Sequence, residues 1–178
     1  YVYTRDEGGD WVLERKFSPP DGNLFDLYAY ALAVDGDLIA IGAFNHQAES
    51  ANGDERHGAV YIYRRSPEVG WVLEQKILPN QPSGANWRFG HTIAINDGQI
   101  LVGAPGTFEQ RGSVFVFDTD ENGRWTESQQ LEVPWSDCLG FAFFGLASKG
   151  NLAVVGNHDD TWNRAAEGRL GIGAALYV

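Results

Sequence analysis

Two short motifs alternate along the 178 residues of this chain and recur at nearly constant spacing. The first is an aromatic or β-branched stretch followed eight residues later by a tryptophan, at Trp11, Trp71 and Trp125. The second is an apolar run that leads into a glycine, at Gly42, Gly103 and Gly156. Regular self-similarity of this kind predicts a series of similar supersecondary units that stack on one another.

The length of the chain varies at one place in each unit. From tryptophan to the next motif glycine the spacing is 31, 32 and 31 residues. From the motif glycines to the glycines that precede the aromatic stretches, the spacing is 16, 9 and 17 residues, ending at Gly58, Gly112 and Gly173. The units therefore share a fixed scaffold and differ mainly in one loop.

Each unit is predicted to contain four antiparallel strands. In the second unit these cover 28–34, 38–43 and 59–63, followed by a strand that begins at Trp71. Asp-Gly turns at Asp35 and Asp97 join the first strand to the second, as in tight hairpins. The second strand is continuously apolar, which predicts burial on both faces. In the fourth strand, alternation predicts one buried face and one polar face, the buried one formed by Trp71, Leu73, Gln75 and Ile77.

Four-stranded units that recur every 55 to 60 residues favour an all-β propeller of radial blades over a two-layer sandwich. We expect a single propeller segment with about three blades. Residues 1–27 supply strands 3 and 4 of a first blade, 28–88 a second blade, 89–140 a third, and 141–178 strands 1 to 3 of a fourth. We expect the chain to be a segment of a longer protein; the rival interpretation is an oligomer that completes the ring.

The phrase Phe89-Gly90, followed by Val102-Gly103-Ala104-Pro105, resembles the FG-GAP signature of integrin α-type propellers. The flanking units have Tyr28-Ala29 and Phe141-Ala142 in place of Phe-Gly. The resemblance implies a β-propeller that acts in binding rather than in catalysis. Integrin-type repeats carry a calcium loop between strands 1 and 2, but here that connection is too short for one, so the chain resembles the shorter, calcium-free variety.

Composition limits the classes of partner. The 24 acidic and 13 basic side chains give a net charge of -11, which disfavours nucleic acid. The chain has no apolar run long enough to insert into a membrane. The single cysteine, Cys138, rules out an internal disulfide, and its role is left open.

Candidate chemical sites are weak. Asp118, Asp120 and Asn122 match half of a calcium loop, but a hairpin turn explains them more simply. His46, His57 and the sequence from His158 to Asp160 lack regular metal-ligand spacing. No nucleophile elbow or phosphate-binding loop is present in the sequence. We therefore expect no enzyme activity, no metal and no cofactor.

The loops from strand 2 to 3 and from strand 4 to the next strand 1 are expected to emerge on one face and to form the recognition surface. Eight residues in these loops are the predicted ligand-binding residues: Asn45, His46, Trp87, Arg88, Trp135, His158, Trp162 and Arg164. The partner is expected to be a protein or a carbohydrate, and the location extracellular or the cell surface. Two alternatives stay open, namely a structural subunit of a multi-chain assembly and a lectin-like propeller.

Overall fold

The computed structural model describes residues 1–47, 56–80, 86–107, 112–132, 145–156 and 174–177. Thirteen strands span this part of the chain, and thirteen were expected. They form four antiparallel sheets, which we call blades 1 to 4.

Blade 1 contains β1 (Val2–Arg5) and β2 (Trp11–Arg15). Blade 2 contains β3 (Tyr28–Asp35), β4 (Leu38–Ala43), β5 (Ala59–Ser66) and β6 (Gly70–Ile77). Blade 3 contains β7 (Thr92–Asn96), β8 (Gln99–Ala104), β9 (Ser113–Thr119) and β10 (Trp125–Glu132). Blade 4 contains β11 (Gly145–Lys149), β12 (Leu152–Gly156) and β13 (Ala174–Tyr177).

The strands of each sheet pair in sequence order, and successive sheets pack face to face around three apolar cores. This arrangement confirms the prediction of a partial β-propeller. The core between blades 2 and 3 includes Val60, Ile62, Val102 and Trp125. No helix in the described part of the chain is long and apolar enough to cross a membrane.

The second strands show how blade packing determines burial. Every residue of β4 is buried, as are all residues of β8 after Gln99, because each of these strands lies between two neighbouring blades. This confirms the expectation drawn from the continuous apolar runs. The equivalent strand β12 differs, since Leu152 and Val154 are partly exposed. Its Val155 packs against blade 3, whereas no sheet covers its opposite face among the described residues.

The outer strands depart from the predicted alternation because each contains a β-bulge. The register shifts at the third residue after each tryptophan, so Glu14, Glu74 and Ser128 are the extra residues. One extra residue moves the rest of the strand to the opposite face. Trp71 therefore packs toward blade 1, whereas Ile77 packs toward blade 3. The prediction that Trp71, Leu73, Gln75 and Ile77 share one face was wrong.

The Phe-Gly pair of the signature joins blade 3 to blade 2. Phe89 is fully buried, its amide donates to His57 O at 2.8 Å, and it forms a parallel bridge with Gly58. Gly90 follows with a φ of +86°, and a Cβ there would lie 2.6 Å from the carbonyl oxygen of Ala59. Only glycine combines this backbone conformation with so close an approach.

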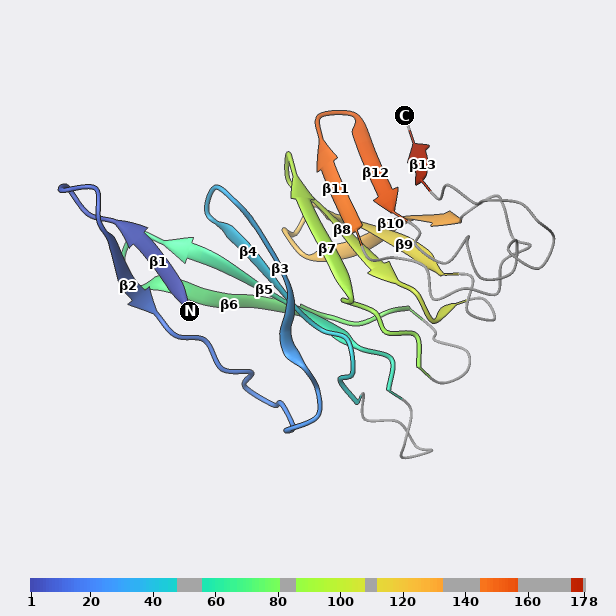
Figure 1. Ribbon diagram of the computed structural model, residues 1–178, viewed down its shortest axis with the longest axis horizontal. Coiled ribbons are helices and arrows are strands. Elements are labelled where there is room, and N and C mark those ends of the chain that lie inside the picture. Colours follow the sequence, from blue (N-terminus) through green and yellow to red (C-terminus); the bar gives the residue numbers. More distant parts are fainter. Residues whose placement is uncertain (48–55, 81–85, 108–111, 133–144, 157–173, 178) are drawn as a thin grey trace, which may run out of the picture.

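The tight turns and the long connections lie at opposite ends of the blades. In Figure 1 the turns β3–β4, β7–β8 and β11–β12 point upward, and the connection from β2 to β3 runs along the lower side. The described ends of the β4–β5 connection also lie on the lower side (Figure 1). We call this lower end the loop face. Among its connections, the one between the second and third strands of each blade is where the repeat spacing varies.

Candidate functional site

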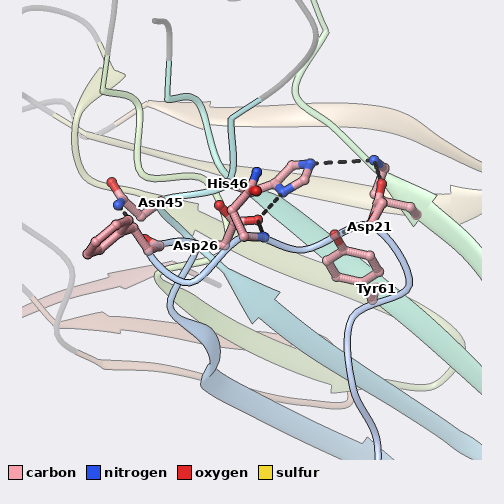
Figure 2. Close-up of polar contacts among 8 residues, drawn as sticks. Asp21, Asp26, Asn45, His46 and Tyr61 are labelled. Atoms are coloured by element: carbon pink, nitrogen blue, oxygen red, sulfur yellow. Dashed lines mark hydrogen bonds and ion pairs between the residues drawn. The ribbon is translucent and has the colours of Figure 1, made fainter.

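A buried carboxylate holds together two connections of the loop face in blade 2. Asp26 lies in the connection from β2 to β3 and is only 1% exposed. Its Oδ2 accepts a hydrogen bond from the amide of Asn23 at 3.0 Å and lies 2.7 Å from Nδ1 of His46, in the connection from β4 to β5 (Figure 2). Its backbone carbonyl accepts from the amide of Asn45 at 3.2 Å. We call Asp26, Asn45 and His46 the loop latch.

A chain of polar groups connects the latch to the outer strand. Nε2 of His46 lies 3.4 Å from Nζ of Lys76 on β6, and Lys76 forms an ion pair with Asp21. The hydroxyl of Tyr61 donates to Oδ1 of Asp21 at 2.7 Å (Figure 2). Because a lysine can only donate, Nε2 of His46 accepts in this arrangement while Nδ1 donates to the carboxylate. The latch is thus a satisfied buried network, which specifies one loop conformation.

The charges of this network change the pKa values of its members. For Asp21, desolvation raises the pKa, but the hydrogen bonds from Lys76 and Tyr61 outweigh it, so the pKa lies below the ordinary value of 3.8. For Tyr61, burial and then the hydrogen bond to Asp21 raise the pKa above its ordinary value. Both shifts favour an ionised Asp21 beside a neutral phenol.

The latch holds apolar side chains in solvent. The side-chain amide of Asn45 donates to the carbonyl of Phe25 at 2.5 Å, while Leu24 is 96% exposed and the side chain of Phe25 points outward. Phe25 as a whole is 69% exposed, and Leu27 is 48% exposed. We call Leu24, Phe25 and Leu27 the apolar tip. Adjacent large apolar residues at this exposure are typical of interaction sites rather than of a free surface.

Blade 3 repeats the backbone frame of the latch with different side chains. By position in the repeat, Trp87 corresponds to Asp26, Gly106 to Asn45 and Thr107 to His46. The amide of Gly106 donates to the carbonyl of Trp87 at 2.9 Å, as Asn45 does to Asp26. The amide of Gly112 donates to Thr107 O at 3.1 Å, and that of Gly58 to His46 O at the same distance. The described ends of these connections therefore share the same backbone hydrogen bonds in both blades.

Four of the eight predicted site residues lie in this frame, and none of the four is fully exposed. His46 is buried at 4% exposure in the latch, and Asn45 is half-buried beside it. Trp87 and Arg88 are half-buried in the equivalent part of blade 3. Trp135, His158, Trp162 and Arg164 lie outside the described residues, and their roles stay predictions.

Two of these expectations need correction. His46 was expected at a ligand-binding surface, but its ring is enclosed by Asp26, Lys76 and the edge of Tyr61. Trp87 was expected at the same ligand-binding surface, yet its ring stacks on Phe115 at 5.9 Å and packs against the core between blades 2 and 3. Both side chains serve to position the loops, because the ring of His46 is already hydrogen-bonded to Asp26 and the ring of Trp87 is already packed on Phe115.

Sequence reasoning missed Asp26 and the apolar tip. Leu24 and Phe25 read as ordinary apolar residues, and nothing in the sequence shows that they point into solvent. The sequence did contain a signal for Asp26, because the repeat spacing gives it the same position in blade 2 that Trp87 has in blade 3. A charged residue at a position where the next blade packs an aromatic side chain needs a buried partner, and His46 is that partner.

The residues around Asp120, which match half of a calcium loop in sequence, form a tight turn. Oδ1 of Asp120 accepts hydrogen bonds from the amides of Asn122 at 2.9 Å and Arg124 at 2.8 Å. The hydrogen bond from the amide of Arg124 is the main cause that lowers the pKa of Asp120. Across the described ranges, no three His, Cys, Asp or Glu side chains come together as metal ligands.

Comparisons with known proteins agree with this geometry. Residues 11–63 match the family model of the FG-GAP repeat. The chain is also similar to integrin alpha-5 of Xenopus laevis, with 31% identity over 144 residues. That alignment covers 75% of this chain and 13% of the integrin subunit, so the chain spans about an eighth of its relative. Propellers of this family are generally non-enzymatic. The blades, the matched repeat and the likeness to an integrin subunit together support an integrin-like FG-GAP β-propeller for this chain.

Proposed function

We propose that this chain is a non-enzymatic protein-binding module of a secreted or surface protein, of the kind that serves adhesion, and that it binds through the loop face. The likeness to an integrin alpha subunit supports a protein partner and a location outside the cell or on its surface. The FG-GAP repeat supports a binding role rather than a catalytic one.

The observation that carries this proposal is that the exposed apolar tip stands on the hydrogen-bonded loop latch, whose Asp26 and His46 are buried. Leu24 and Phe25 are exposed, yet the backbone beneath them is held by the carboxylate of Asp26 and the amide of Asn45. A partner that buries these side chains gains hydrophobic free energy of about 1.5–3 kcal/mol for each one fully covered. Because the loop is already ordered, little of that gain is lost in fixing its conformation.

The remaining predicted residues extend the proposed surface. Trp135, His158, Trp162 and Arg164 belong to connections of the same two types, and aromatic or arginine side chains are frequent anchors at protein interfaces. Asn45, His46, Trp87 and Arg88 act beneath them as the frame. Binding thus depends on the apolar tip and on the loops of blades 3 and 4 together.

The proposal is tested by screening the purified chain against an array of extracellular protein domains and, in parallel, against a glycan array. Phe25→Ser and Leu24→Ser should reduce binding to the selected protein domain at least ten-fold without lowering Tm. Val69→Ser is the matched control, because Val69 is 65% exposed in the turn between β5 and β6 and lies away from the loop face. Equal losses for Phe25→Ser and Val69→Ser, or binding to glycans alone, would contradict the proposal.

One observation favours the second candidate, a structural subunit of a multi-chain assembly. Blades 1 and 2 leave several large apolar side chains exposed, among them Trp11, Leu13, Leu32 and Val34. Apolar surface of this extent is typical of a contact with further protein. Sedimentation of the purified chain separates the two candidates: a monomer that binds through the apolar tip supports the binding module, and an obligate oligomer supports the subunit.

A further inference from the structure

The end of the blades opposite the loop face is acidic. Strands pair antiparallel in sequence order, so the turns after the first and third strands of each blade lie at this end, which we call the turn face. Six such hairpin turns, all within the described residues, contain one basic residue, Arg124, and eight acidic ones. The acidic residues are Asp6, Glu7, Asp10, Asp37, Glu68, Asp97, Asp120 and Glu121. A surface of this sign attracts cationic groups and repels anionic ones.

A cavity of about 250 Å³ opens on the turn face between blades 2 and 3. It is lined by the β3–β4 and β7–β8 turns, which point to the same side of the molecule (Figure 1). Leu38 and Trp125, which are 4% and 3% exposed, and the half-buried Ile95 give the cavity apolar walls. Two exposed residues with carboxylates, Asp35 and Asp37, line it as well. Both blades have all four strands, so the cavity lies between two complete sheets.

Arg64 brings one positive charge to the cavity, and neighbouring carboxylates neutralise it. Its guanidinium contacts Oδ1 of Asp37 at 3.2 Å and forms an ion pair with Glu74 on β6. Asp35 has no ion-pair partner in the described part of the chain. One positive charge beside the three carboxylates of Asp35, Asp37 and Glu74 leaves a net charge of -2. The cavity therefore combines apolar walls with an unbalanced negative charge.

This combination matches a lysine side chain, whose methylene stem is apolar and whose ammonium is a compact charge. A purely apolar ligand would bury carboxylates without a partner, and an anionic ligand would be repelled. A divalent metal ion needs more oxygen ligands, and no group of three His, Cys, Asp or Glu side chains is found among the described residues. An arginine would bring a second guanidinium beside Arg64, which already engages Asp37 and Glu74.

We propose that this cavity, which we call the lysine pocket, binds a lysine side chain from a basic segment of a protein partner. The methylenes of the lysine pack on Leu38 and Ile95, and its ammonium lies at the carboxylates of Asp35 and Asp37. The acidic turns around the pocket attract further basic residues of the same segment. The module thus has two recognition surfaces at opposite ends, one apolar and one acidic, and the second does not depend on the first.

The test uses a blocked peptide of five residues, with one lysine between glycines, and two analogues of it. Norleucine in place of lysine keeps an apolar stem without the charge, and 2,3-diaminopropionic acid keeps the charge on a short stem. Each peptide is titrated into the isotope-labelled chain, and NMR follows the amides of Gly36 and Gly98 and the indole N–H of Trp125. The lysine peptide should shift these signals, and both analogues should bind at least about three-fold more weakly.

Asp35→Asn tests the pocket from the side of the protein. It should weaken binding of the lysine peptide at least about three-fold without lowering Tm, because Asp35 is exposed and has no ion pair to lose among the described residues. Glu121→Gln is the matched control, since it removes the same charge from an exposed residue of the turn face that does not line the pocket. Phe25→Ser on the loop face should leave peptide binding unchanged, so failure at one surface does not affect the other.

The lysine pocket is overturned by any of four results. Equal affinity of the norleucine peptide would show that the charge is not recognised, and equal affinity of the short-stem peptide would show diffuse attraction to the turn face. Equal losses for Asp35→Asn and Glu121→Gln would also show diffuse attraction. Binding that leaves the signals of Gly36, Gly98 and Trp125 unmoved would place the lysine elsewhere.

Discussion

Ala29 and Gly90 occupy the same position in successive blades and share a left-handed backbone, with φ values of +68° and +86°. Each follows the aromatic residue of the signature, Tyr28 in one blade and Phe89 in the other. The repeat imposes this conformation at both places, although only one of them has a glycine. A left-handed conformation costs an alanine about 1–2 kcal/mol.

Ala29→Gly should therefore stabilise the protein by about 1 kcal/mol, measured as an increase in the free energy of unfolding in urea. The matched control is Ala33→Gly in the same strand, where φ is not positive. That change should destabilise by about 0.5–1 kcal/mol, because glycine loses more conformational freedom than alanine on folding. The same sign for both substitutions would refute the strain at Ala29.

Gln75→Glu should weaken the junction between blades 2 and 3. The substitution keeps the acceptor for the amide of Trp125 but places a carboxylate against its carbonyl, where Gln75 now donates at 2.9 Å. We expect a loss of about 1–3 kcal/mol in the free energy of unfolding, the cost of leaving a partly buried hydrogen-bonding group unpaired. Gln99→Glu beside the exposed β7–β8 turn controls for the added charge. An equal, small effect of Gln75→Glu and Gln99→Glu would show that the hydrogen bonds between Gln75 and the backbone of Trp125 do not stabilise the protein.

Trp87→Ala should destabilise the fold rather than act on binding alone. The ring of Trp87 stacks on Phe115 and lies 6.2 Å from the ring of His57, so truncation leaves a cavity at the edge of a core. We expect a loss of about 2–4 kcal/mol, read from urea denaturation. Phe25→Ala serves as the comparison, since removing an exposed ring should change stability by less than about 0.5 kcal/mol.

The loops of blade 2 should become less stable in acid because of Asp21. Its pKa in the folded state lies below the ordinary value of 3.8, so Asp21 contributes stability above that pH, and the contribution is lost as pH falls through the folded value. The fall in unfolding free energy between about pH 6 and about pH 3 should be smaller in Asp21→Asn than in the original protein.

Asp35→Asn, which removes a carboxylate from the exposed β3–β4 turn, is the control for that experiment and should leave the pH profile closer to the original. If Asp21→Asn and Asp35→Asn flatten the profile equally, the ion pair with Lys76 is not the cause.

The sequence was sufficient for the blade architecture but not for the detail of the outer strands or the site. Apolar periodicity and constant spacing predicted the four-stranded unit, because strands such as β4 and β8, which lie between two blades, are continuously apolar. The bulge at Glu74 was missed because one extra residue leaves no mark in composition, although it reverses the face of every residue after it.

The candidate site could be predicted as a region but not residue by residue. Loop length pointed to the loop face, and Asn45, His46, Trp87 and Arg88 do lie in its frame. Whether a loop side chain points inward or outward depends on tertiary partners. Asp26 pairs with His46, 20 residues further along the chain, and that pairing decides that Phe25 faces solvent.

The bulge gives each blade a direction. Before it, a strand such as β10 presents Trp125 to the preceding blade; after it, the strand presents a residue such as Gln129 to the following one. A blade therefore presents one part of its outer strand to the preceding blade and the other part to the following blade. Duplicating or deleting a whole unit keeps a junction intact only where the side chains on its two sides match, as Gln75 and Trp125 do between blades 2 and 3.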